Sequence, residues 1–187
     1  MRVYVVDNGG QWTHREWRVL KYLGVETKVI PNTTPLDQLD VDALVLSGGS
    51  PSVALEGDRM GLNSEYIDHA GVPILAICAG FHLMVNHLGG ATGPARSPEY
   101  GKTTLYVDRP NDLFEGLPRE FVVWASHNDE VLRLPDTFEI LAHSDNCQVE
   151  AVKVRDRPLY GLQFHPEVEN TEHGHDIFRN FLRVVEE

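Results

Sequence analysis

The amino-acid sequence predicts an α/β domain in three layers, with a parallel sheet covered by helices on both faces. Apolar, strand-like segments alternate with amphipathic helical segments from residue 3 to residue 90. Repeated β-α-β units of this kind place their strands in parallel and their helices over the sheet. The chain has 187 residues, of which 42% are hydrophobic. This length and composition predict a single domain, residues 1–187, with one sizeable core.

The first half of the chain supplies the alternating segments in order. Residues 3–6 (VYVV) predict a buried strand that ends at the turn-forming cluster 7–10. Residues 12–24 predict a helix with Trp12, Trp17 and Leu20 near one face, closed by a glycine. The remaining segments predict strands over 26–31, 43–49 and 73–77, and helices over 58–70 and 79–90.

The second half changes to shorter strands separated by turn formers at 109–112 and 134–136. The predicted strands cover residues 102–107, 121–126, 130–134, 138–144, 149–154 and 159–165. A last helix is predicted over 174–185, with Ile177, Phe178 and Phe181 facing inward.

Charge and cysteine content narrow the class of protein. The net charge of −12 argues against nucleic-acid binding, which needs clustered Lys and Arg. Two cysteines are too few for a disulfide framework, which predicts a reducing compartment. No signal-peptide pattern opens the chain, and the longest apolar stretch, around residues 72–81, is too short to span a bilayer. We therefore expect a cytoplasmic protein without a membrane partner.

Residues 73–80 (PILAICAG) place Cys78 where a predicted strand meets a predicted helix. A strand–turn–helix of this kind is the sulfur counterpart of a nucleophile elbow. The helix N-terminus favours a thiolate there, and its free N–H groups can hold an oxyanion. The alternative is an inert buried thiol, since free cysteines are commonly buried. Cys147, which no helix follows, is predicted to be structural.

Residues 161–169 (GLQFHPEVE) offer a proton carrier for such a thiolate. In an extended segment His165 and Glu167 point to one side, so that the carboxylate can orient the imidazole. The alternative is a turn with two solvated polar groups. A metal site formed by these two residues with His173 and His175 is another alternative, but no zinc-type spacing supports it, and we expect none.

Gly48 and Gly49 stand at the end of the strand predicted over 43–49. Glycine lets backbone N–H groups turn toward a substrate. A phosphate cradle is the competing interpretation, but no GxxxxGK[ST] pattern is present. Together with the backbone at Cys78, the two glycines can form the second half of an oxyanion hole.

Taken together, SGG (47–49), ICAG (77–80) and QFHPEVE (163–169) resemble the class I (triad) glutamine amidotransferases. Within that class, residues 6–35, WASHNDEV (124–131) and the segment 164–181 resemble the separate amidotransferase subunits of archaeal GMP synthases. The resemblance covers nearly the whole chain. It implies a flavodoxin-like fold, with a mixed, mostly parallel sheet between helices, and an enzyme that hydrolyses glutamine to supply ammonia.

The resemblance also implies a role for each site residue. Cys78 would be the nucleophile, His165 the acid–base and Glu167 its orienting partner. The implied oxyanion and glutamine contacts are Gly48, Gly49, Ala79, His82, Ser126, His127 and Asn128. No cofactor is implied for this chain. ATP and Mg²⁺ are expected on a partner, the synthetase subunit that converts XMP to GMP.

Two positions depart from the family pattern. His82 stands where the family usually has a glutamine, so that glutamine affinity or its pH dependence is expected to differ. Ser50 intervenes before Pro51 where the family commonly reads SGGP, which predicts a reshaped loop.

The residues leave three other functions open. They are an amidotransferase for a different acceptor, a stand-alone cysteine hydrolase of γ-glutamyl compounds, and a non-catalytic regulatory subunit, which His82 favours.

Overall fold

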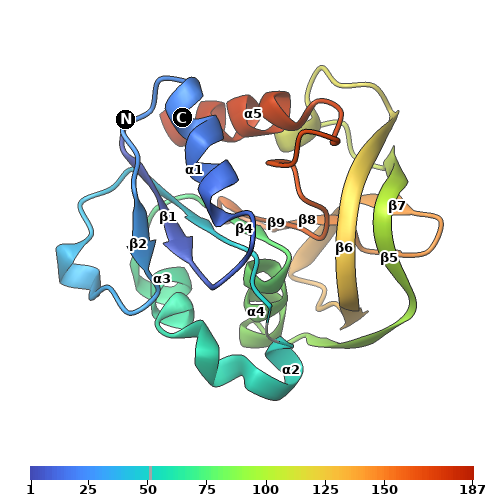
Figure 1. Cartoon of the computed structure of the whole chain (residues 1–187), viewed down its shortest axis with the longest axis horizontal. Helices are drawn as coiled ribbons and strands as arrows, with labels where there is room; N and C mark the ends of the chain where they lie inside the picture. The colour runs from blue at the N-terminus through green and yellow to red at the C-terminus, as the bar shows by residue number, and fades with distance from the viewer. Residues whose placement is uncertain (51) are drawn as a thin grey trace.

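The computed structural model describes residues 1–50 and 52–187, and its strands form one nine-stranded mixed sheet (Figure 1). The order is β2-β1-β3-β4-β9-β8-β7-β5-β6. The first five strands in this order pair in parallel and the others antiparallel. The strands are β1 (Val3–Asp7), β2 (Val29–Pro31), β3 (Ala43–Leu46), β4 (Ile74–Ile77), β5 (Ala91–Val107), β6 (Glu120–Arg133), β7 (Phe138–Ser144), β8 (Ala151–Val154) and β9 (Leu159–Leu162).

Helices cover both faces of the sheet, which confirms the predicted three-layer α/β fold (Figure 1). Helices α1 (Thr13–Tyr22) and α5 (Gly174–Glu186) lie on one face. Helices α2 (Val53–Glu56), α3 (Asn63–His69) and α4 (Ala79–His87) lie on the other. Three short 3₁₀ segments are η1 (Leu36–Gln38), η2 (Gly57–Met60) and η3 (Asp112–Phe114).

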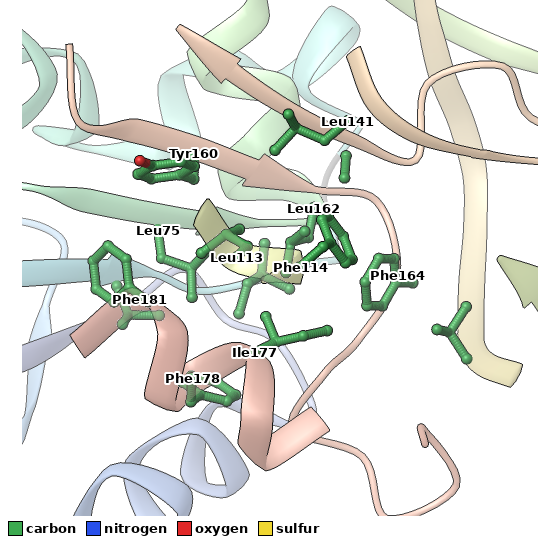
Figure 2. Close-up of a cluster of buried hydrophobic side chains, with 14 of the residues drawn as sticks. Leu75, Leu113, Phe114, Leu141, Tyr160, Leu162, Phe164, Ile177, Phe178 and Phe181 are labelled. Carbon is green, nitrogen blue, oxygen red and sulfur yellow. The ribbon is translucent and has the colours of Figure 1, made fainter. Parts of the chain in front are cut away.

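Alternating strand residues divide the core into two clusters, one on each face of the sheet. Along β3, Ala43 and Val45 pack on the α1 and α5 face, whereas Leu44 and Leu46 pack on the α4 face. This is the two-residue period of a strand that is buried on both sides. Figure 2 shows the first cluster, in which Ile177, Phe178 and Phe181 of α5 meet the sheet, as the sequence predicts.

The long ribbon of β5 and β6 differs from the predicted pattern. The two strands predicted over 121–126 and 130–134 are one continuous strand, and β5 begins 11 residues before the predicted residue 102. Pro94 and Pro98 interrupt the strand pattern in the sequence, and the sheet accommodates this region by a register shift between Pro94 and Glu99. Residues 126–129 (SHND), which alone resemble a polar turn, therefore lie within a strand.

The helix predicted over 58–70 is divided into η2 and α3, and the strands predicted to end at residues 49 and 165 end at Leu46 and Leu162. Of the helices in the described part of the chain, none is long and apolar enough to cross a membrane.

Gly80 allows α4 to begin directly against the end of β3. A Cβ at this position would lie 2.6 Å from the backbone oxygen of Leu46 and 2.9 Å from that of Ser47. Backbone atoms cannot move aside as a flexible side chain can, so the helix start would have to shift.

We predict that Gly80→Ala lowers the free energy of unfolding by about 1–3 kcal/mol, because overpacking forces the backbone apart. Chemical denaturation measures this loss. The matched control is Gly57→Ala, where a Cβ meets nothing within 4 Å and φ is −58°. Equal stability of the two variants would contradict the close packing at Gly80.

Candidate active site

Three neighbouring strands end at one edge of the sheet and deliver the predicted site residues there. β4 lies between β3 and β9 in parallel register. Gly48 and Gly49 follow β3, Cys78 follows β4, and His165 follows β9. The carboxyl edge of a parallel sheet is where α/β proteins commonly hold ligands.

Cys78 occupies the sharp turn between β4 and α4 that the sequence predicts. Its backbone has φ 49° and ψ −107°, which is rare for a residue with a side chain. Such a conformation costs on the order of 1–3 kcal/mol and clusters at functional sites. The Cys78 N–H donates to the Leu162 oxygen at 2.7 Å, which fixes the turn on the sheet. The residue is 8% exposed.

His165 lies against Cys78 and is bonded to Glu167 on its other side. Its Nδ1 is 3.1 Å from Glu167 Oε2, and both side chains are buried. A Cβ at Gly48 would sit 3.3 Å from His165 Cε1 and 3.5 Å from Cys78 Cβ, so position 48 lies directly beside both side chains. The strand has already ended, and a turn, rather than the predicted extended segment, brings the imidazole and the carboxylate together.

The surroundings of His165 favour its charged form. Burial opposes protonation, but the Glu167 carboxylate and the neighbouring Cys78 sulfur outweigh burial and raise the pKa of His165 well above its usual value. Trp12 packs edge-on against the ring, with centroids 4.6 Å apart. A protonated imidazole can therefore lie next to the Cys78 sulfur.

All ten predicted site residues line one hollow of about 410 Å³, a volume typical of small-molecule sites. They are Gly48, Gly49, Cys78, Ala79, His82, Ser126, His127, Asn128, His165 and Glu167. Their chemical roles remain predictions. Ser50 also lines the hollow, while Pro51, on which the predicted reshaping of the loop depends, lies outside the described residues.

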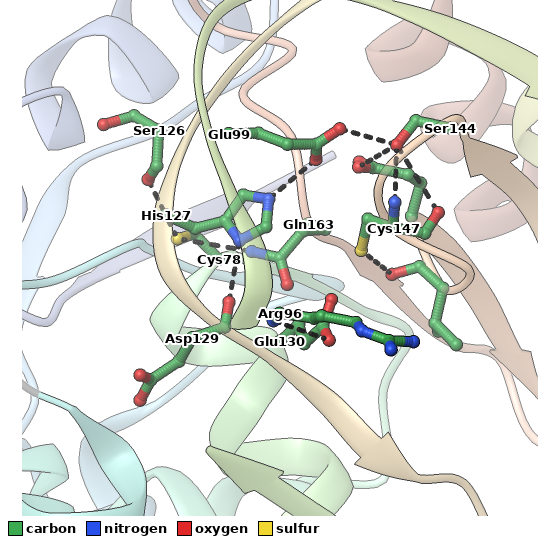
Figure 3. Close-up of polar contacts among 12 residues, drawn as sticks. Cys78, Arg96, Glu99, Ser126, His127, Asp129, Glu130, Ser144, Cys147 and Gln163 are labelled. Atoms are coloured by element: carbon green, nitrogen blue, oxygen red, sulfur yellow. Dashed lines mark hydrogen bonds and ion pairs between the residues drawn. The ribbon is translucent and has the colours of Figure 1, made fainter. Parts of the chain in front are cut away.

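β6 contributes the polar residues predicted to contact glutamine. The Cys78 thiol donates to the Ser126 carbonyl oxygen at 3.9 Å (Figure 3). Asn128 Oδ1 accepts a hydrogen bond from the Tyr100 hydroxyl. His127 is almost fully buried, with Nδ1 2.7 Å from the Asp129 oxygen and Nε2 2.8 Å from Glu99 Oε1.

His127 belongs to a buried polar network that continues through Glu99 and Ser144 (Figure 3). The Ser144 hydroxyl lies 2.6 Å from Glu99 Oε2 and 3.2 Å from Glu150 Oε1. Burial opposes ionisation of Glu99, but hydrogen bonds from neighbours, first among them His127, lower its pKa to about 2. Burial and then Glu99 raise the pKa of Glu150. One carboxylate and one neutral carboxyl group therefore share Ser144.

The metal site considered from the sequence is not assembled. Among the described residues, the atoms that could hold an ion gather instead at Glu99, His127, Cys147 and Glu150, within 4.8 Å of one another. Hydrogen bonds occupy most of these atoms, although Glu150 Oε2 has no partner.

Three residues that lie at the site have no sequence signal of a role there. Gln163 is fully buried beside Cys78, although it belongs to the QFHPEVE segment. The sequence predicts Trp12 only as part of a helix face. Glu16 of α1 lines the hollow, and burial followed by the nearby Glu167 raises its pKa well above the usual value. No local pattern marks a residue that reaches the site through tertiary packing.

His82 lines the hollow, but its Nε2 is already used inside the protein. It lies 2.7 Å from Gln163 Oε1, and the residue is 4% exposed. Burial lowers the pKa of His82 to about 4, so the ring is neutral at neutral pH. The neutral ring must carry its proton on Nε2 to donate to the amide oxygen.

The chain belongs to the family described as "Glutamine amidotransferase class-I", which matches residues 4–185. It is 50% identical over 185 residues to a glutamine-hydrolyzing GMP synthase subunit of Thermoplasma acidophilum, covering 98% of this chain and 92% of that protein. The protein of the same description from Methanocaldococcus jannaschii is 48% identical over 186 residues, covering 97% of this chain and 96% of that protein.

Solved structures agree with this assignment. A crystal structure described as a putative GMP synthase subunit from Thermoplasma acidophilum superposes with a TM-score of 0.95 at 50% identity, covering 100% of this chain and 94% of that chain. A glutamine amidotransferase from Thermotoga maritima, at 19% identity and a TM-score of 0.82, covers 100% and 99% of the two chains and shares the fold.

His82 provides a test of the site's electrostatics. Burial lowers the pKa of this ring to about 4 in the folded protein, whereas the pKa of a histidine in an unfolded chain is about 6.5. Between these values the unfolded chain binds more protons, so stability falls as the pH drops.

We predict that wild type loses roughly 2–3 kcal/mol more stability than His82→Gln between pH 7 and pH 4.5. Urea denaturation at both pH values measures the two losses, and other titrating groups cancel in the comparison. His69→Gln, which replaces an exposed histidine, should lose as much as wild type. Equal losses in wild type and His82→Gln would show that His82 is not buried in the neutral form.

Proposed function

We propose that this chain is the glutamine amidotransferase subunit of a two-subunit GMP synthase. The observation that carries the proposal is the buried set of Cys78, His165 and Glu167 at one hollow. The similarity to glutamine-hydrolyzing GMP synthase subunits over nearly the whole chain supports the acceptor. We place the protein in the cytoplasm.

In the first half of the reaction, the Cys78 thiolate attacks the side-chain amide carbon of glutamine and forms a C–S bond. The backbone N–H groups of Gly49 and Ala79 stabilise the oxyanion that develops on the amide oxygen. His165 donates its proton to the departing nitrogen as the C–N bond breaks, releasing ammonia and leaving a γ-glutamyl thioester.

In the second half, neutral His165 removes a proton from water, whose oxygen attacks the thioester carbon. The C–S bond breaks, glutamate leaves, and the thiolate and the imidazolium are restored. Glu167 holds the imidazole through Nδ1 during both halves. Ser126, His127 and Asn128 border the end of the hollow formed by β6, where the glutamine backbone would lie.

Ammonia produced in this way needs an acceptor site on another chain. The 187 residues contain no SGGxDS-type pyrophosphatase loop for ATP. We therefore assign ATP, Mg²⁺ and the conversion of XMP to GMP to a separate synthetase subunit, and no cofactor to this chain.

The first experiment traps the nucleophile. A glutamine analogue with a diazo ketone should alkylate Cys78, and peptide mass spectrometry should locate the adduct there. Cys147 should stay unlabelled because it is 2% exposed, its thiol donates to the Val149 oxygen, and burial raises its pKa. An adduct at Cys147, or no adduct at all, would refute the assignment of Cys78 as the nucleophile.

His165→Asn should reduce glutamine turnover by roughly 10²- to 10⁴-fold, because it removes the group that transfers the proton.

The second experiment tests the partner. The chain alone should hydrolyse glutamine slowly, and addition of the synthetase subunit with ATP, Mg²⁺ and XMP should raise the rate. The control is Cys78→Ala, with which GMP should form from added ammonia but not from glutamine. A full rate without the partner would instead indicate a stand-alone hydrolase.

A further inference from the structure

Gln163 lies beside Cys78 because of the register of two parallel strands. Ile77, the last residue of β4, pairs with Leu162, the last residue of β9. The residues that follow them, Cys78 and Gln163, therefore lie side by side at the edge of the sheet. The backbone N–H of Gln163 donates to the backbone oxygen of Glu150 at 2.8 Å, and the whole residue is 0% exposed. Its side chain is therefore enclosed by the protein and has no contact with solvent.

The two ends of the Gln163 amide meet different partners. The nitrogen donates to Cys78 Sγ at 3.8 Å, a long N–H···S contact that Figure 3 shows directly. The oxygen faces His82 Nε2 at 2.7 Å. His82 lies one helical turn after Cys78, where its backbone N–H donates to the Cys78 oxygen at 2.9 Å. The three residues thus form a closed ring of contacts.

The orientation of this amide matters for the charge on sulfur. An amide N–H stabilises a thiolate, whereas an amide oxygen in the same place would repel it. An amide can rotate to exchange its two ends, so a donor is needed on the far side to hold the oxygen there. Neutral His82 provides that donor through Nε2–H.

We propose that Gln163 stabilises the Cys78 thiolate by hydrogen bonding and that His82 is the positioning residue that fixes the Gln163 amide for this task. The proposal rests on the proposed function, in which Cys78 is the nucleophile. It also explains how the site accommodates histidine at position 82. A glutamine amide also carries an N–H donor, so His82→Gln tests whether a donor toward Gln163 Oε1 is what this position must supply.

Other titratable groups also surround the sulfur and must stay unchanged in the test. They are His165 and Glu167 after β9, Glu16 of α1 and His127 of β6. The variants below leave all four in place.

The experiment measures how fast iodoacetamide alkylates Cys78 in the folded chain between pH 5 and pH 10, with the adduct quantified by peptide mass spectrometry. Gln163→Leu and Gln163→Met remove the donor without adding a charge. Each should slow alkylation at pH 7 by roughly tenfold or more, because a hydrogen bond to a charged group usually contributes about 1.5–3 kcal/mol. The rate–pH curve should move to higher pH. Thermal unfolding identifies any variant that fails to fold, and either variant alone is sufficient.

His82 variants separate positioning from a general structural role. His82→Gln keeps a donor and should stay within about twofold of the wild-type rate, whereas His82→Leu removes it and should slow alkylation by several-fold. Wild-type rates in both Gln163 variants, or equal slowing in His82→Gln and His82→Leu, would overturn the proposal.

Alkylation by iodoacetamide does not require glutamine, so the outcome of this measurement does not depend on whether the proposed function is correct. If the glutamine analogue fails to label Cys78 while the alkylation series behaves as expected, the proposed activity is wrong and the Gln163 contact stands. If the analogue labels Cys78 but the alkylation series is flat, the activity stands and the contact is not functional.

Discussion

The site depends on one constraint, the parallel register of β3, β4 and β9. These strands come from three distant parts of the chain, yet their pairing fixes where each one ends. Residues 47–49, Cys78 and the segment 163–167 therefore meet at one edge without any local attraction between them. A shift of register by one residue would turn each side chain to the other face of the sheet and separate them.

Packing on both faces offsets the strain that the site requires. Cys78 has an unfavourable backbone conformation, and Gly80 has no side chain that would separate the start of α4 from the backbone of residues 46 and 47. The hydrogen bond from Cys78 to Leu162 and the two buried clusters hold this turn in place. Local strain of about 1–3 kcal/mol is small beside the burial of several large apolar side chains.

Two buried carboxyl groups at the site each lie against a histidine. His165 is paired with Glu167, and His127 with Glu99, whose pKa is lowered to about 2. Two more carboxyl groups lie close by, and burial raises the pKa of both Glu16 and Glu150. Their neutral forms avoid a second negative charge next to an existing one, which a low-dielectric interior would penalise.

The fold and the central residues of the site could be predicted because their signals are local. The strand–turn–helix around Cys78 and the alternation of strands and helices are visible in short segments. The continuous strand β6 could not be predicted, because its partner β5 contains prolines that resemble a loop and only pairing reveals it. Likewise, the turn that unites His165 with Glu167 resembles an extended strand in the sequence.

The contact between Gln163 and His82 could not be found from the sequence for a further reason. The two residues lie 81 positions apart, and each alone has an ordinary interpretation, one as a strand-end residue and the other as a substituted substrate contact. Only the strand register brings the amide to the sulfur, and only burial makes the histidine a neutral donor. On the proposal made above, the effect of a substitution at position 82 on Cys78 depends on whether the new side chain donates a hydrogen bond to Gln163 Oε1. Its similarity to the glutamine that the family usually has at this position matters less.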